Sequence, residues 1–160
     1  MSDGIRTTTA TQRQRVEYPA SRYSDAVIAY AILRISFGVN FMLHGLSRLL
    51  TDHAKFLGYV NQYFEHTPLM PRVLLVPFAT VLPPLEATLG LLLLVGFLTR
   101  FSLIAGGLTM TAIVFGTNLA QDWNNAGPQL IYCFIFYYLL AHRRELNTLS
   151  FDALRGRSSL

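Results

Sequence analysis

Long apolar runs alternate with short polar segments along most of this chain. Residues 26–46 form a run of 21 residues with one full charge, Arg34, and residues 101–120 form an uncharged run of 20. At about 1.5 Å per residue, either run covers ~30 Å as a helix, which is the thickness of a hydrocarbon core. Ser24 and Asp25 precede the first run and are candidate N-cap residues. The pattern predicts membrane-spanning α-helices.

Two further apolar runs complete a predicted set of four spans. Residues 73–98 contain three prolines and the single charge Glu86, and we expect a kink or break near Pro83 and Pro84. Residues 128–142, a run that opens with proline, cover only ~22 Å, so this span needs flanking residues or a locally thinned bilayer. The predicted fold class is all-α, an integral membrane four-helix bundle.

The segments outside the spans are polar. Residues 1–23 and 143–160 are expected to be tails, and residues 24–142 form the transmembrane domain. Residues 51–70 interleave aromatic and polar side chains at helical spacing, which is typical of an amphipathic interfacial helix between the first two spans. No short apolar run followed by a cleavage site is seen near residue 1, so a removed secretory signal is not expected.

The distribution of basic residues predicts the orientation. With four spans, both tails and the turn at Arg100 lie on one side of the membrane, and the nine basic residues there are Arg6, Arg13, Arg15, Arg22, Arg100, Arg143, Arg144, Arg155 and Arg157. The other side has three, which are Arg48, Lys55 and Arg72. Because basic residues accumulate on the cytoplasmic side, both termini are predicted to be cytoplasmic.

Composition agrees with this picture and excludes several function classes. The chain is 52% hydrophobic and 14% charged, whereas soluble domains are roughly 25% charged. Its net charge of +4 comes from residues at the ends of apolar runs, and nucleic-acid binding would need them clustered on one face. The single cysteine, Cys133, excludes an internal disulfide framework and a multi-thiolate metal site. We expect no metal and no nucleic acid.

Arg34 and Glu86 are the only full charges deep within the predicted spans. A lone charge in a bilayer is costly, so we expect the two to form an intramembrane ion pair. Such a pair could fix the register of two helices, or it could serve proton transfer or ligand binding. A third interpretation leaves Arg34 to extend alone to the membrane surface.

Small and polar residues define two further candidate features. Helix packing through close backbone approach is predicted at Gly38, Gly45, Gly90 and Gly107. A polar pocket near the outer leaflet, with chemistry suited to a quinone head group, is predicted from Asn40, His44, Asn118 and Gln129. The same side chains could instead form hydrogen bonds between helices. Haem binding is disfavoured because two axial histidines would be needed at similar depth, and His44 is the only histidine well inside a predicted span. The sequence also shows no catalytic motif.

Three segments of the chain resemble the DoxX family of small four-helix membrane proteins. They are LRISFGVNFMLHGLSRL at 33–49, PPLEATLGLLLLVGFLTRFSLIAG at 83–106 and LSFDAL at 149–154, and the resemblance extends over residues 32–153. The residues that match the family pattern are Arg34, Gly45, Glu86, Gly90, Gly96, Arg100 and Asp152. The chain departs from the pattern at Arg48, where lysine is usual. It departs also at Asn147 and Thr148, which replace the glycine-rich approach to the final motif.

The resemblance implies a membrane subunit of a respiratory or quinone-linked electron-transfer complex, through the related DoxD subunit of thiosulfate:quinone oxidoreductase. Such a subunit would carry no redox centre or covalently bound cofactor of its own. It would bind a quinone, with lipid and other membrane subunits as partners. The alternative is a non-catalytic accessory subunit that stabilises a larger membrane complex. The expected location is the inner membrane of a bacterium or archaeon, as a multi-pass protein.

Overall fold

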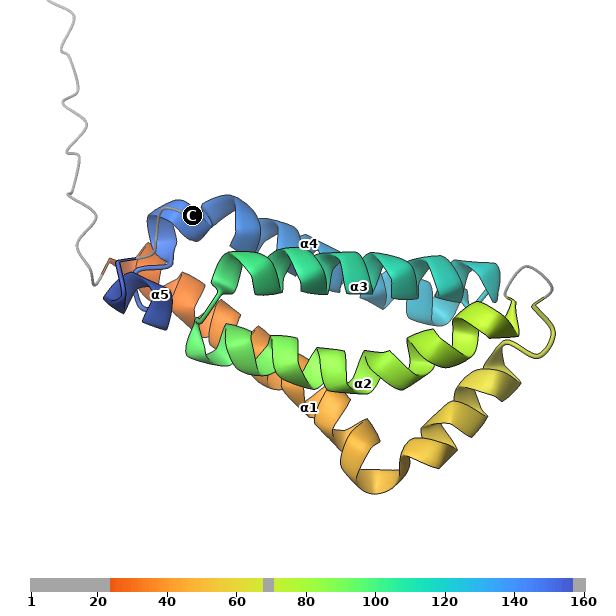
Figure 1. Cartoon of the computed structure of the whole chain (residues 1–160). Helices are drawn as coiled ribbons and strands as arrows, with labels where there is room; N and C mark the ends of the chain where they lie inside the picture. The colour runs from red at the N-terminus through yellow and green to blue at the C-terminus, as the bar shows by residue number, and fades with distance from the viewer. Residues whose placement is uncertain (1–23, 68–70, 157–160) are drawn as a thin grey trace, which may run out of the picture.

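The computed structural model describes residues 24–67 and 71–156, without the side chains of residues 51 and 52. Within them the chain folds into four long helices and one short one (Figure 1). They are α1 (Asp25–Tyr63), α2 (Arg72–Val95), α3 (Thr99–Leu119), α4 (Trp123–Leu146) and α5 (Phe151–Leu154). The predicted all-α class is confirmed. Three segments, Asp25–Leu50, Arg72–Val95 and Thr99–Leu119, are long and apolar enough to cross a membrane.

Helix α1 is longer than the first predicted span. Ser24 caps it, because its side chain accepts a hydrogen bond from the Val27 amide at 3.4 Å. The helix then continues for 39 residues, with a sharp bend near the end of its apolar part (Figure 1). Residues 53–63, which we call the α1 arm, fold back toward the start of α2. The segment predicted as a separate interfacial helix is therefore largely the bent end of α1.

Helix α2 remains continuous through all three prolines. Of the two outcomes predicted near Pro83 and Pro84, a kink or a break, the break is absent, and the two halves of the helix are not collinear (Figure 1). Gly96 ends α2 with φ 72°, and the amides of Gly96 and Phe97 both donate to the Leu92 carbonyl at 2.9 Å. This left-handed ending makes the tight turn to α3.

The boundaries of α4 differ most from the prediction. The helix extends beyond the 128–142 run at both ends. It begins upstream because Asp122 is its N-cap and accepts a hydrogen bond from the Asn125 amide at 3.2 Å. Pro128 therefore lies within the helix and not at its first position. With 24 residues, α4 is ~36 Å long, and most of the residues that it gains beyond the apolar run are polar or charged. It lies beside α3 but is not among the three segments that are long and apolar enough to cross a membrane, so the predicted fourth span is not recovered by length and composition.

Aromatic and leucine side chains from all four long helices form one core. The fully buried members are Tyr30, Phe37, Phe41, Leu89, Leu93, Leu103, Met110, Phe136 and Leu139. Phe136 packs edge-on against Phe37 and Phe41, with ring centroids 4.7 and 5.5 Å apart. The core keeps the helices packed at one end of the bundle, while the α1 arm lies across the other.

Candidate functional site

A cavity of about 680 Å³ lies in the half of the bundle near the α1 arm. Its walls come from α1, the arm, α2, α3 and α4, and most of them are apolar or aromatic. The polar and charged side chains that line it include His44, Arg48, Glu86 and Gln129, together with the phenol groups of Tyr59, Tyr63 and Tyr132. An apolar chamber with a few convergent polar groups is the usual form of a small-molecule site.

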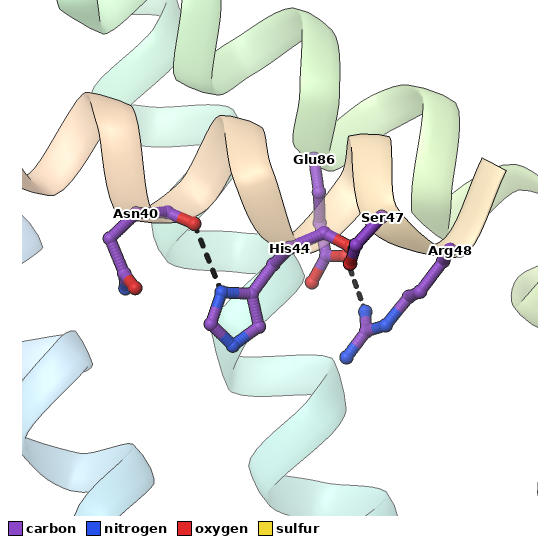
Figure 2. Close-up of polar contacts among 5 residues, drawn as sticks. All are labelled: Asn40, His44, Ser47, Arg48 and Glu86. Atoms are coloured by element: carbon purple, nitrogen blue, oxygen red, sulfur yellow. Dashed lines mark hydrogen bonds and ion pairs between the residues drawn. The ribbon is translucent and has the colours of Figure 1, made fainter. Parts of the chain in front are cut away.

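Glu86 forms an ion pair with Arg48 at the edge of this cavity (Figure 2). The Glu86 side chain is 3% exposed and that of Arg48 is 30% exposed, so the carboxylate is the buried partner. The guanidinium of Arg48 also lies over the Phe56 ring, 4.9 Å from its centroid. The α1 arm therefore covers the cation that neutralises Glu86.

The predicted pair of Arg34 with Glu86 is wrong. Arg34 is 2% exposed, yet its guanidinium donates to backbone carbonyls, those of Leu93, Leu94 at 3.2 Å and Leu149 at 2.8 Å. The physical reason is the direction of helical side chains, which tilt toward the N-terminus of their own helix. Arg34 therefore extends toward the end of α2, while Arg48, on the same face of α1, reaches back to the depth of Glu86.

Two of the four predicted pocket residues line the cavity, His44 and Gln129. Asn40 reaches it indirectly, because its Nδ2 donates to the Tyr132 hydroxyl at 3.2 Å. Asn118 does not line it, and its Nδ2 donates at 2.7 Å to the Val114 carbonyl in its own helix. The structure thus brings three of the four together and leaves Asn118 outside.

The His44 ring has a defined hydrogen-bonding role. Its Nδ1 lies 2.9 Å from the Asn40 carbonyl oxygen, one turn earlier on α1 (Figure 2). A carbonyl oxygen can only accept, so Nδ1 carries the hydrogen, and in the neutral ring Nε2 is the acceptor. Gln129 also has an unused group, since its buried Oε1 has no partner. The cavity therefore offers acceptors as well as the guanidinium donors of Arg48.

Hydropathy and charge along the sequence do not identify several of the cavity residues. The sequence marks Arg48 as a basic residue outside the spans and as a departure from the family pattern, and it gives no reason to single out Tyr132. Phe56, Tyr59, Val60 and Tyr63 recur at helical spacing, and that spacing places them on the face of the arm that lines the cavity. The spacing was visible in the sequence, but the bend that turns this face inward was not.

A hydrogen bond holds the end of the α1 arm to the start of α4. The Tyr63 hydroxyl donates to Asp122 Oδ2 at 2.7 Å, and the same carboxylate accepts from the Asn125 side chain at 2.6 Å. These two bonds, that of Asn125 foremost, lower the pKa of Asp122. Burial and the bond to Asp122 raise the pKa of Tyr63. Both groups thus keep the protonation states that the bond requires.

Glycines set the register between α1 and α2 beside the cavity. A Cβ at Gly45 would collide with the Pro83 carbonyl oxygen and the Ala87 amide, and one at Gly38 would lie 2.6 Å from the Leu94 amide. Gly90 is equally close to the backbone at Met42. Gly107, the fourth predicted packing glycine, makes only ordinary contact with Phe136. Its neighbour Gly106 is the one that Phe136 covers.

The opposite end of the bundle holds a second polar cluster, which we call the end cluster: Arg34, Gly96, Asn147, Ser150 and Asp152. The Asp152 carboxylate accepts from the amides of Leu98 at 2.9 Å and Thr99 at 2.8 Å, and so caps α3. A Cβ at Gly96 would lie 2.7 Å from the Arg34 guanidinium. This part of the predicted polar C-terminal tail is therefore folded and buried.

Comparison with known proteins gives one match. The model of the DoxX family matches residues 29–118, more than half of the chain, from the first turns of α1 almost to the end of α3. No curated protein and no solved structure gives a significant match. Within the matched range lie His44, Arg48 and Glu86 from the cavity, and Arg34 and Gly96 from the end cluster.

Proposed function

The chain belongs to the DoxX family, and from that premise we propose that it is a membrane subunit that binds a quinone in the cavity beside Glu86, within a respiratory or quinone-linked electron-transfer complex. The observation that carries the proposal is the lining of the cavity. Most of the lining is aromatic or aliphatic, and His44, Arg48, Glu86 and Gln129 add polar and charged groups to it. A quinone has the same division, with a flat apolar ring and tail and two oxygens at opposite edges.

The residues present suit both oxidation states of the ring oxygens. The Arg48 guanidinium is a donor for a carbonyl oxygen, whereas His44 Nε2 and the unpartnered Gln129 Oε1 are acceptors for a hydroxyl. A bound quinone would supply two-electron, two-proton redox chemistry, and the electrons would pass to or from a partner subunit that carries a redox centre. The chain's own part is binding, orientation and the handling of a proton.

His44 is the residue that can take up that proton. Its Nδ1–H donates to the Asn40 carbonyl, so Nε2 is the nitrogen that can accept a proton. The product is an imidazolium with a hydrogen on each nitrogen. The Glu86 carboxylate, which forms an ion pair with Arg48, would also stabilise an imidazolium at His44. We assign His44 as proton acceptor, Glu86 as its electrostatic support, and Arg48 and Gln129 as orienting groups.

Location and assembly follow from the same proposal. The two ends of the described chain lie at the same end of the bundle as the turn between α2 and α3. The excess of basic residues in the sequence at that end supports a cytoplasmic location for it, with the cavity toward the outer side of a bacterial or archaeal inner membrane. Other membrane subunits and lipid then contact the exposed apolar faces of the bundle.

Quinone binding can be measured through Trp123, the single tryptophan, which lies at the start of α4. In detergent micelles, a short-tailed ubiquinone analogue should quench its fluorescence in a saturable way. H44A and Q129L should each weaken binding of the reduced analogue by up to tenfold, as expected for one hydrogen bond. N118A is the matched control, because Asn118 is polar and intramembrane but outside the cavity.

The accessory-subunit alternative gives the opposite result. A scaffold without a ligand site would show no saturable quenching, or quenching that H44A, Q129L and N118A leave equally unchanged. Stoichiometric purification with redox subunits, combined with that result, would replace the quinone proposal.

A further inference from the structure

A second, smaller cavity lies at the other end of the bundle, in contact with the end cluster. It has a volume of about 120 Å³ and opens between the last turn of α4 and α5. Its lining residues are Arg143, Arg144, Asn147, Thr148, Asp152 and Ala153. The larger cavity, beside Glu86, is lined by residues from the first turns of α4, so the two cavities lie at opposite ends of that helix.

Two polar atoms of this lining are buried without a partner, Asn147 Oδ1 and Thr148 Oγ1. Asn147 is only 8% exposed. Buried polar groups in folded proteins nearly always have a partner, so two such atoms beside one small cavity indicate that a polar group occupies it. The volume equals that of about four waters at ~30 Å³ each, which is enough for one tetrahedral anion.

The charge of the lining favours an anion. Arg143 and Arg144 contribute two positive charges and Asp152 one negative charge. Both oxygens of Asp152 already accept the amides of Leu98 and Thr99, so they are engaged with the start of α3. The three ionised side chains of the lining sum to a net positive charge, and the Thr148 hydroxyl is an additional donor.

The amide of Asn147 can also present a donor. Its Nδ2 now donates to the Thr99 hydroxyl at 3.2 Å. Because a hydroxyl both donates and accepts, the amide can turn over, with Oδ1 accepting from Thr99 and Nδ2 released. An anion would then be met by the Arg144 guanidinium, a hydroxyl and an amide, with the charge of Arg143 nearby.

We propose that this end cavity binds a phosphate group, carried by an anionic phospholipid or by a free phosphate. Guanidinium groups match phosphate oxygens in a bidentate geometry, and basic pockets at the ends of membrane helices bind acidic head groups. The position at the end of the bundle, beside the α2–α3 turn, is the depth of a lipid head group. The site is independent of the quinone proposal.

The test uses the full chain reconstituted in phosphatidylcholine vesicles, and in an equimolar mixture of phosphatidylcholine and phosphatidylglycerol. Lipid that remains bound after extraction into detergent is counted by native mass spectrometry. The wild-type protein should retain phosphatidylglycerol selectively. R144Q should reduce that retention about fivefold, as expected for ~1 kcal/mol per basic contact near a membrane, and T148V by a similar factor, as expected for one lost hydrogen bond of ~1 kcal/mol. Inorganic phosphate added to the detergent sample tests the second source.

The matched control is R100Q, because Arg100 is an exposed arginine at the same end of the bundle but outside the cavity. Retention in R100Q should equal that of the wild type. Equal losses in R100Q and R144Q would overturn the proposal, since they would show only a diffuse attraction of acidic lipid. If the wild type shows no selectivity for phosphatidylglycerol, the effect of inorganic phosphate decides. A melting temperature that inorganic phosphate raises in the wild type and not in T148V identifies free phosphate as the ligand. If neither ligand has an effect, the proposal is overturned. Helix content by circular dichroism confirms that each variant folds.

Discussion

Asp152 Oδ2 accepts a hydrogen bond from the Thr99 amide at 2.8 Å, although the two residues are 53 positions apart. Its other oxygen accepts the Leu98 amide, and the Asp152 amide itself donates to the Gly96 carbonyl at 3.0 Å. The first turn of α3 therefore obtains its cap from outside its own sequence. The helix has no side-chain cap at Leu98, its own N-cap position.

Replacing Asp152 should therefore destabilise the whole bundle. D152A leaves two amides at the start of α3 without acceptors, and we expect a loss of about 1–3 kcal/mol in the free energy of unfolding. D152N keeps one acceptor oxygen and should lose less. Thermal unfolding followed by circular dichroism in detergent measures both, and equal stability of D152A and wild type would contradict the capping role.

Gly45 should not tolerate even one added methyl group. G45A forces a Cβ against the backbone of Pro83 and Ala87, so the two helices must separate, at a cost of about 1–3 kcal/mol. G58A provides the control, because a Cβ at Gly58 meets nothing within 4 Å. On helix propensity alone, G58A should be neutral or stabilising by up to ~1 kcal/mol. A similar loss in both variants would show that G45A acts through α1 itself.

Removing Arg48 should be more harmful than removing the pair. R48M leaves the buried Glu86 carboxylate without its cation, and we expect a loss of about 3 kcal/mol. The double variant R48M/E86Q has no buried charge and should recover much of that stability. A double-mutant cycle from thermal unfolding gives the coupling between the two residues. R34M added to E86Q should show no such coupling, because Arg34 binds carbonyls instead.

The contact between the arm and α4 should weaken in acid. The pKa of Asp122 is lowered in the folded protein, so its contribution to stability is complete above the unfolded value of about 3.9 and is lost as the pH falls through the lower folded value. Stability measured from neutral pH down to strong acid should show this loss in wild type. D122N, which cannot titrate, should lack that component, and Y63F should reduce it. An unchanged acid profile in D122N would contradict the assignment.

The sequence predicts the helices that cross the membrane better than it predicts how they end. Apolar runs locate the first three spans because lipid contact demands them, but residues such as Trp123 and Arg144 continue α4 beyond its apolar run. Their helical hydrogen bonds do not depend on hydropathy. The burial of Asp152 goes with contacts to residues more than 50 positions away, and no local pattern encodes it or the bend of α1.

The candidate site shows the same limit. Arg34, Arg48 and Glu86 could all be recognised as costly charges near or within the spans, and His44 and Gln129 as polar groups at similar depth. Which arginine pairs with Glu86 depends on the direction of each side chain. It also depends on the register between α1 and α2, which is fixed where Gly45 contacts the backbone of Pro83. Periodicity shows which face a residue occupies, but depth between two helices depends on their packing.

The distant cap on α3 also orders the events of biosynthesis. Chains are made from the N-terminus, so α2, the Gly96 turn and α3 all leave the ribosome before Asp152 exists. Until α4 has been inserted and α5 reaches the turn, two amides of α3 and one guanidinium contact, Arg34 with the Leu149 carbonyl, have no permanent partner. The last segment of the chain to be made is thus the one that completes the contacts of the first three helices at this end of the bundle.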